Sequence, residues 1–119
     1  MADQSSEPVQ AVLDCHQLLA WIIPKLDRMP RQRRYTLGER LETLLLQVLE
    51  NLLEASYSKS SASTLKRANL KLDVARHLWR LANSLEAVPR KHYLAGSEMM
   101  VKLGQQIGGW RRQQASTNV

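Results

Sequence analysis

The sequence predicts an all-α protein built as an up-down antiparallel four-helix bundle. Phenylalanine is absent, and only five glycines and four prolines occur among 119 residues, a composition that favours helix over strand. Apolar residues also recur at helical spacing in four segments, and in the last two of them the steps alternate between three and four. The chain is long enough to bury a core and too short for two ordinary domains, so we expect a single domain over residues 1–119.

The first helix is expected over about residues 8–25. Pro8 is tolerated in its first turn, and Pro24 marks its last turn. His16 falls on the apolar side with no second metal ligand four residues away, so we interpret it as a partly buried core or interface histidine. The apolar stripe of this helix consists of Val9, Val12, Leu13, Ala20 and Ile23.

The second helix is expected over about residues 36–56. Thr36 and Glu39 fit a capping box, in which the hydroxyl and the carboxylate bind opposite backbone N–H groups at a helix start. The polar segment 57–63 is then expected to be a loop within the bundle. The apolar face of this helix consists of Leu37, Leu41, Leu44, Leu45, Val48, Leu52 and Ala55.

The third helix is expected over about residues 64–86, and its apolar surface covers roughly half of its circumference. One seam consists of Leu65, Ala68, Leu72, Ala75, Trp79 and Ala82. A second stripe beside it consists of Leu70, Val74, Leu78, Leu81 and Leu85. Two interpretations stay open: both stripes lie in the core of one bundle, or the surplus is buried against another subunit.

The fourth helix is expected over about residues 90–112, followed by a mobile tail at 113–119. Its apolar positions alternate by three and four, which is typical of bundles. Glycines inside it disfavour helix, and two interpretations stay open: some of them permit a close backbone approach, or Gly108 and Gly109 simply let the end of the helix fray. The apolar stripe consists of Tyr93, Gly96, Met100, Leu103, Ile107 and Trp110.

Positive charge is unevenly distributed along this chain of net charge +6. The segments 1–27 and 35–58 are acidic, whereas 28–34, 59–89 and 90–119 are basic. A basic balance favours phosphate backbones or acidic surfaces as partners. The densest cluster lies in an expected loop and consists of Arg28, Arg31, Arg33 and Arg34.

Arg76 and Arg80 lie one turn apart on the third helix, so their guanidinium groups share one side. Asp73, three residues before Arg76, is the acid placed to pair with it. A solvated charged face is one interpretation, and contact with phosphates or with an acidic partner is the other. Further candidates for nucleic-acid or partner binding are Lys66, Arg67, Lys71, Arg90, Lys91, Arg111 and Arg112.

The sequence contains no motif that indicates an enzyme, a cofactor or a metal. It has no glycine-rich phosphate loop and no nucleophile elbow, and its three histidines lack metal-ligand spacing. Cys15 is the only cysteine, which excludes an intrachain disulfide and fits a reducing compartment. The polar N-terminus lacks a signal-peptide pattern, and no apolar run approaches membrane-spanning length. We therefore expect a non-enzymatic, cytoplasmic protein.

Four segments in the same order resemble the accessory variability determinant (Avd) proteins of diversity-generating retroelements. They are 21–25 (Trp-Ile-Ile-Pro-Lys), 29–41, 78–82 (Leu-Trp-Arg-Leu-Ala) and 104–110 (Gly-Gln-Gln-Ile-Gly-Gly-Trp). The similarity covers about residues 8–112. Proteins encoded in 23S ribosomal RNA intervening sequences share the broad pattern.

The resemblance implies a bundle that assembles as a homopentamer and binds the retroelement reverse transcriptase. It also implies contact with RNA or DNA through basic surfaces, in support of mutagenic retrohoming. Arg76 and Arg80 resemble a pair of arginines that the family carries on its third helix. The cluster 28–34 fits the family pattern at Pro30 and Arg31, and a structural role for it stays open.

Two other functions remain open at this point. One is that of the ribosomal intervening-sequence proteins, which share the shape but have no polymerase partner, and neighbouring genes would distinguish it. The other is a general helical interaction module whose positive charge is incidental. Nucleic-acid binding that weakens steeply with added salt would argue against that module and for a retroelement or intervening-sequence protein.

Overall fold

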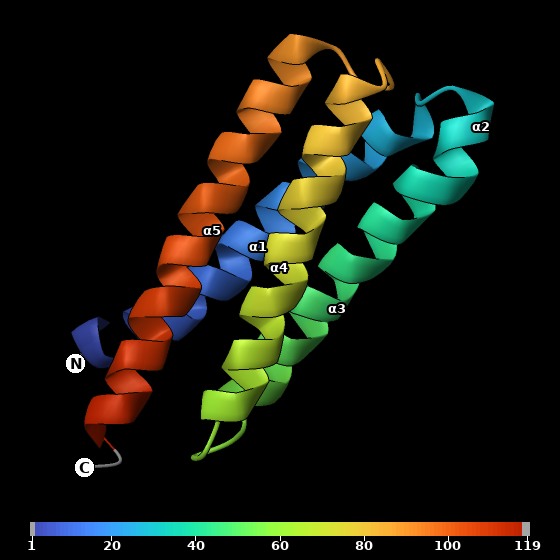
Figure 1. The fold of residues 1–119 in the computed structure, drawn as a ribbon. Helices are drawn as coiled ribbons and strands as arrows, with labels where there is room; N and C mark the ends of the chain where they lie inside the picture. Colours follow the sequence, from blue (N-terminus) through green and yellow to red (C-terminus); the bar gives the residue numbers. More distant parts are fainter. Residues whose placement is uncertain (1, 118–119) are drawn as a thin grey trace.

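The computed structural model describes residues 2–117, with side chains described for residues 8–115. Four long helices run alternately up and down, which confirms the all-α four-helix bundle (Figure 1). A short helical segment and one π-helical turn precede the second long helix. The elements are α1 (Ala2–Asp27), α2 (Arg31–Arg33), the π-turn η1 (Arg34–Gly38), α3 (Glu39–Ser56), α4 (Ala62–Ser84) and α5 (Arg90–Thr117).

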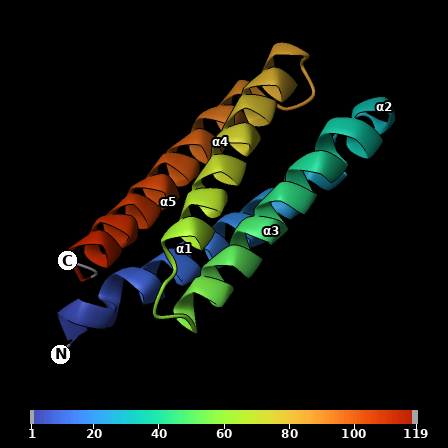
Figure 2. The same ribbon diagram turned by 60° about the horizontal axis from the view of Figure 1, so that its bottom comes forward.

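The helices form a ring in which α1 and α4 lie diagonally opposite each other. Each of these two packs against both α3 and α5 (Figure 2). Trp79 of α4 is fully buried and meets Trp21 of α1 edge to face across the centre, with ring centroids 6.2 Å apart. The bundle is elongated and measures 48 × 21 × 19 Å.

The expected seams of α3, α4 and α5 are confirmed as the core. All six seam residues of α4 are at most 1 % exposed, and the stripe of α5 is buried from Gly96 to Trp110. The apolar face of α3 is also buried. Leu37, which lies in η1 just before α3, is partly buried and packs against the core. Helical periodicity therefore located the inner face of α3, α4 and α5, with strict alternation by three and four in α4 and α5.

The expected apolar stripe of α1 is only partly correct. Val12 and Ile23 are partly buried and pack against the core, but Val9 and Leu13 are about half exposed, and Ala20 and His16 are also exposed. The physical reason is that α1 carries a second apolar stripe beside the first, and burial selects that one. The buried residues of α1 are Ala11, Asp14, Cys15, Leu18, Leu19, Ile22 and Leu26.

The expected capping box at Thr36 is also wrong. The helix begins earlier, because Pro30 starts a helical turn that accepts N–H donors from Arg33 and Arg34. Thr36 then lies inside the π-turn and donates its hydroxyl to the carbonyl oxygens of Gln32 and Arg33. Met29 is buried under this junction, and its Sδ lies 3.4 Å from a Cβ added at Gly38.

The remaining boundaries differ from expectation mainly at the ends of the chain. α1 starts at Ala2, so Pro8 lies inside the helix rather than in its first turn. α5 continues to Thr117 instead of ending near residue 112, so the expected mobile tail is helical over 113–117; residues 118–119 lie outside the described part. None of the helices described is long and apolar enough to cross a membrane.

Four members of the second stripe of α4 face solvent in this protomer. Leu70 is 64 % exposed, and Val74, Leu81 and Leu85 are between 37 % and 43 % exposed. Leu78 alone packs partly against the core. The interpretation of this stripe as ordinary core is therefore wrong for these four positions, and the protomer leaves an apolar strip uncovered.

Candidate nucleic-acid interface

Three depressions lie in a row between α4 and α5, with volumes of about 500, 410 and 180 Å³. Adjacent depressions share wall residues. Lys66 and Arg111 line both of the larger ones, and Asp73 and Arg76 line both the middle one and the smallest. The three are therefore one continuous feature, which we call the α4–α5 groove.

The groove brings together basic residues from two segments distant in sequence. α4 contributes one set of cations and the C-terminal part of α5 contributes Arg111 and Arg112. Asp73 is the only carboxylate among the described lining residues. The cations of the groove are Lys66, Arg67, Arg76, Arg80, Arg111 and Arg112.

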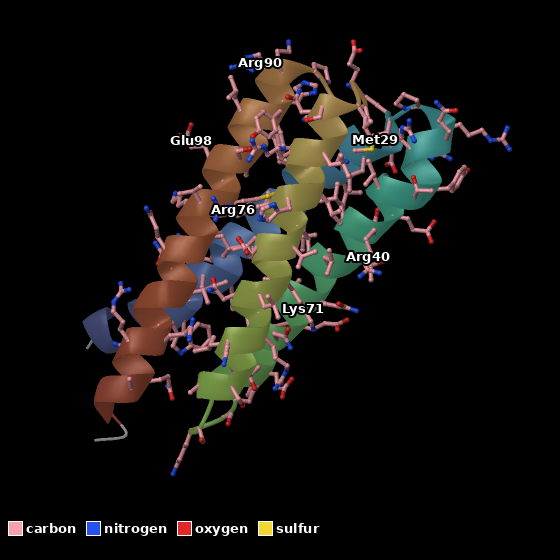
Figure 3. All side chains as sticks on the ribbon, in the orientation of Figure 1. Met29, Arg40, Lys71, Arg76, Arg90 and Glu98 are labelled. Carbon is pink, nitrogen blue, oxygen red and sulfur yellow. The ribbon has the colours of Figure 1, made fainter. Side chains whose placement is uncertain are left out.

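Arg76 and Arg80 line the same depression, as their spacing predicts. Arg76 lies midway along α4 (Figure 3), where its Nη1 is 3.8 Å from Oδ1 of Asp73. Both partners are about half exposed, so this ion pair is screened by solvent and contributes little to stability. Arg76 can therefore exchange Asp73 for a phosphate at small cost.

Lys71 points away from the groove toward α3. Its Nζ donates a 3.1 Å hydrogen bond to Oδ1 of the buried Asn51 (Figure 3). Arg67 is intermediate, because it lines the groove while its Nη2 lies 3.8 Å from Oε2 of Glu54 on α3. Lys71 thus serves the α3–α4 interface, which distinguishes it from the groove cations.

The other expected site residues lie at the end of the bundle where α1 ends and α5 begins. Arg28 is in the turn after α1, whereas Arg31, Arg33 and Arg34 are helical rather than in a loop. Arg90 and Lys91 open α5 at the same end (Figure 3). Apart from Lys71, the expected site residues therefore separate into the α4–α5 groove and this terminal cluster, which consists of Arg28, Arg31, Arg33, Arg34, Arg90 and Lys91.

Arg34 has a structural role within the terminal cluster. Its Nη1 donates to the carbonyl oxygen of Asp27, and its Nη2 donates to Oη of Tyr35 at 2.6 Å. The guanidinium also lies 4.8 Å from the centroid of the Tyr35 ring. These contacts tie the π-turn to the end of α1, so part of the arginine cluster stabilises the connection.

Three residues that were not expected to belong to a binding site complete this end of the molecule, namely Trp21, Lys25 and His92. Lys25 Nζ lies 4.6 Å from the Trp21 ring centroid, and the His92 ring meets Trp21 edge to face at 6.1 Å. Desolvation, followed by the charges of Lys25, Lys91 and Arg28, lowers the pKa of His92 below its usual 6.5. His92 is therefore mostly neutral at pH 7.

Cys15 lies in the core of the bundle. Cys15 is fully buried, and burial raises the pKa of its thiol to about 12, so the reactive thiolate is not populated at pH 7. No group of three or more His, Cys, Asp and Glu side chains in the described part of the chain could hold a metal ion.

A protein-family model described as bAvd-like matches residues 10–114. This chain belongs to the bAvd-like family. The match covers α3 and α4 completely and most of α1 and α5. It includes the resemblance segments 21–25, 29–41, 78–82 and 104–110, so the Avd-type assignment made from them is confirmed. No curated protein and no solved structure matches the chain. The groove cations of this bAvd-like protein all lie within the matched residues.

Proposed function

We propose that this bAvd-like protein is a non-enzymatic accessory factor of a diversity-generating retroelement. In this role it binds the retroelement reverse transcriptase and template RNA or cDNA, and so supports mutagenic retrohoming. Family membership over residues 10–114 supports the retroelement context. The observation that supports the binding role is the α4–α5 groove, whose described lining contains six cationic side chains and one carboxylate.

The proposed chemistry is contact with the phosphate backbone. Guanidinium forks bind phosphate oxygens bidentately, and such contacts position a nucleic acid without specifying its sequence. Arg76 and Arg80 line the depression at one end of the groove. Lys66, Arg111 and Arg112 line the depression at the other end. A scaffold of this kind needs no cofactor, and we assign none.

The proposal includes assembly into a homo-oligomer, with a pentamer as the stoichiometry that the family resemblance implies. Leu70, Val74, Leu81 and Leu85 support it, because an apolar strip along one helix is costly to leave in water. Exposed Val9 and Leu13 add apolar surface on α1. A cytoplasmic location belongs to the same proposal.

The test uses the full-length protein with labelled RNA and with the reverse transcriptase encoded beside its gene. RNA binding followed by fluorescence anisotropy is expected to weaken linearly on a log–log plot against salt. The reverse transcriptase is expected to co-purify with the tagged protein. The proposal is overturned if the protein binds neither RNA nor the reverse transcriptase at low salt. A gene inserted inside a ribosomal RNA gene, with no reverse transcriptase gene beside it, would favour the intervening-sequence alternative.

A further inference from the structure

Gly104 and Gly108 line the α4–α5 groove, and nothing within the protomer requires them to be glycine. A Cβ added at Gly104 would have Leu72 Cδ2 as its nearest neighbour, at 3.7 Å. At Gly108 the nearest atom would be Arg112 Nη1, at 3.5 Å, the far end of a flexible side chain. Both distances are ordinary contacts, so alanine would fit at both positions.

Gly96, in the same helix, differs from Gly104 and Gly108 because its surroundings leave no room for a side chain. A Cβ there would lie 2.7 to 2.9 Å from three atoms of the Trp79 ring, so internal packing explains this glycine. Gly104 and Gly108 lower helix propensity in the interior of α5 without such a reason. They act on the groove instead, because no side chain projects from its α5 wall at these two positions.

The walls of the groove indicate what occupies that space. Among the described lining residues, Leu70 is the only large apolar side chain that is exposed. A helix docked in a groove needs apolar anchors at i, i+3, i+4 and i+7, and this lining does not offer them. Six cations with one carboxylate suit a polyanion instead.

The length of the groove points to a polymer rather than to an isolated phosphate. From Ala62 to Arg80, the lining residues at its two ends on α4, the helix rises about 27 Å. Cations are distributed along this whole length, from Arg112 and Lys66 at one end to Arg80 at the other. Several consecutive phosphates can therefore be contacted together.

We infer that a nucleic-acid strand lies lengthwise in the α4–α5 groove, with its sugar-phosphate backbone passing over Gly104 and Gly108. This inference rests on the proposed function and adds the path of the strand to it. The glycines make room for the close approach, and the cations on both walls bind the phosphates. The affinity for nucleic acid therefore depends on the open space in the groove as well as on its positive charge.

The experiment fills the groove without changing its charge. Gly104→Leu and Gly108→Leu, singly and together, are compared with Gln105→Leu, an exposed neighbour that lines none of the three depressions. Anisotropy with a labelled oligouridine RNA measures affinity, and circular dichroism checks helicity. The double variant is expected to bind at least about tenfold more weakly than wild type, equivalent to about 1.4 kcal/mol. Gln105→Leu is expected to bind as wild type does.

Each other outcome is decisive. RNA binding by the double leucine variant equal to that of wild type overturns the strand path but leaves the proposed function intact. No RNA binding by wild type itself overturns the proposed function. Polyglutamate is tested as a competitor for RNA. If it displaces RNA from wild type and binds more weakly to the leucine variants, the groove binds an acidic protein segment, which contradicts the inference. If the double leucine variant does not fold, Gly104→Ala with Gly108→Ala replaces it, and unchanged RNA affinity of that folded variant contradicts the inference.

Discussion

Gly96 of α5 lies directly against the ring of Trp79 on α4. A Cβ at Gly96 would come within 2.7 Å of Trp79 Nε1, and this Nε1 donates a 3.0 Å hydrogen bond to the carbonyl oxygen of Tyr93 on the same helix. The close approach thus lets a fully buried indole satisfy its N–H on the backbone of α5. This contact fixes the distance between the two helices that form the groove.

We expect Gly96→Ala to destabilise the protein although it improves helix propensity. Trp79 is fully buried and cannot move away, so overpacking should cost about 1–3 kcal/mol. Gly104→Ala is the matched control in the same helix, and it should stabilise the fold by about 0.5–1 kcal/mol because its Cβ meets no close atom. Urea unfolding of both variants measures the difference. Equal effects of the two substitutions would contradict the packing account.

The stability of the protein is expected to fall as the pH drops through 6.5. His92 has a folded-state pKa below this unfolded-state value, so the unfolded chain binds more protons in that window and acidification favours unfolding. NMR titration should give His92 a pKa below 6.5, and Lys25→Gln should raise it because one neighbouring charge is removed. The account fails at this point if the pKa of His92 in wild type is at or above 6.5.

Assembly is expected to depend on the exposed strip of α4. Leu81→Lys places a charge on a side chain that is 43 % exposed in the protomer, so it should leave the fold intact while opposing burial at a subunit interface. Light scattering at micromolar concentration should give an oligomeric mass for wild type and a smaller mass for the variant. Leu94→Lys on α5, at a similar exposure of 51 %, controls for loss of apolar surface outside this strip. A monomeric wild-type mass would end the assembly proposal.

Cys15 is expected to be inert in the folded protein. Burial raises the pKa of its thiol to about 12, and its side chain is fully buried. A thiol-reactive dye at pH 8 should therefore label it slowly in buffer and rapidly in concentrated urea. Rapid labelling under native conditions would show that the packing between α1 and its neighbours is looser than described.

The sequence predicted the fold well because in α4 and α5 the pattern of apolar residues is compatible with only one buried face. Each has one seam of alternating threes and fours, and large residues such as Trp79 and Trp110 fix which face is inside. α1 has two adjacent apolar stripes, so periodicity alone could not choose between Leu13 and Leu18. The start of α3 was missed because Pro30, rather than Thr36, begins the helical turn.

The site could be predicted only in part. The i, i+4 spacing placed Arg76 and Arg80 together, because that relation is internal to one helix. The association of Arg76 with Arg111 depends on the register between α4 and α5, to which the contact of Gly96 with Trp79 contributes. The hydrogen bond of Lys71 to Asn51 across α3 and α4 was equally invisible to local spacing.

The most direct measurement of the central claim is RNA binding by Arg76→Ala with Arg80→Ala. The control is Arg40→Ala with Lys102→Ala, which removes the same charge from exposed positions outside the groove lining. If the groove binds phosphates, the first variant keeps its helicity and assembly, loses at least about tenfold in affinity, and lowers the log–log salt slope by about 1.4 for single-stranded RNA. The control then binds nearly as wild type does. Equal affinity and equal salt slope for the two double variants would contradict the claim.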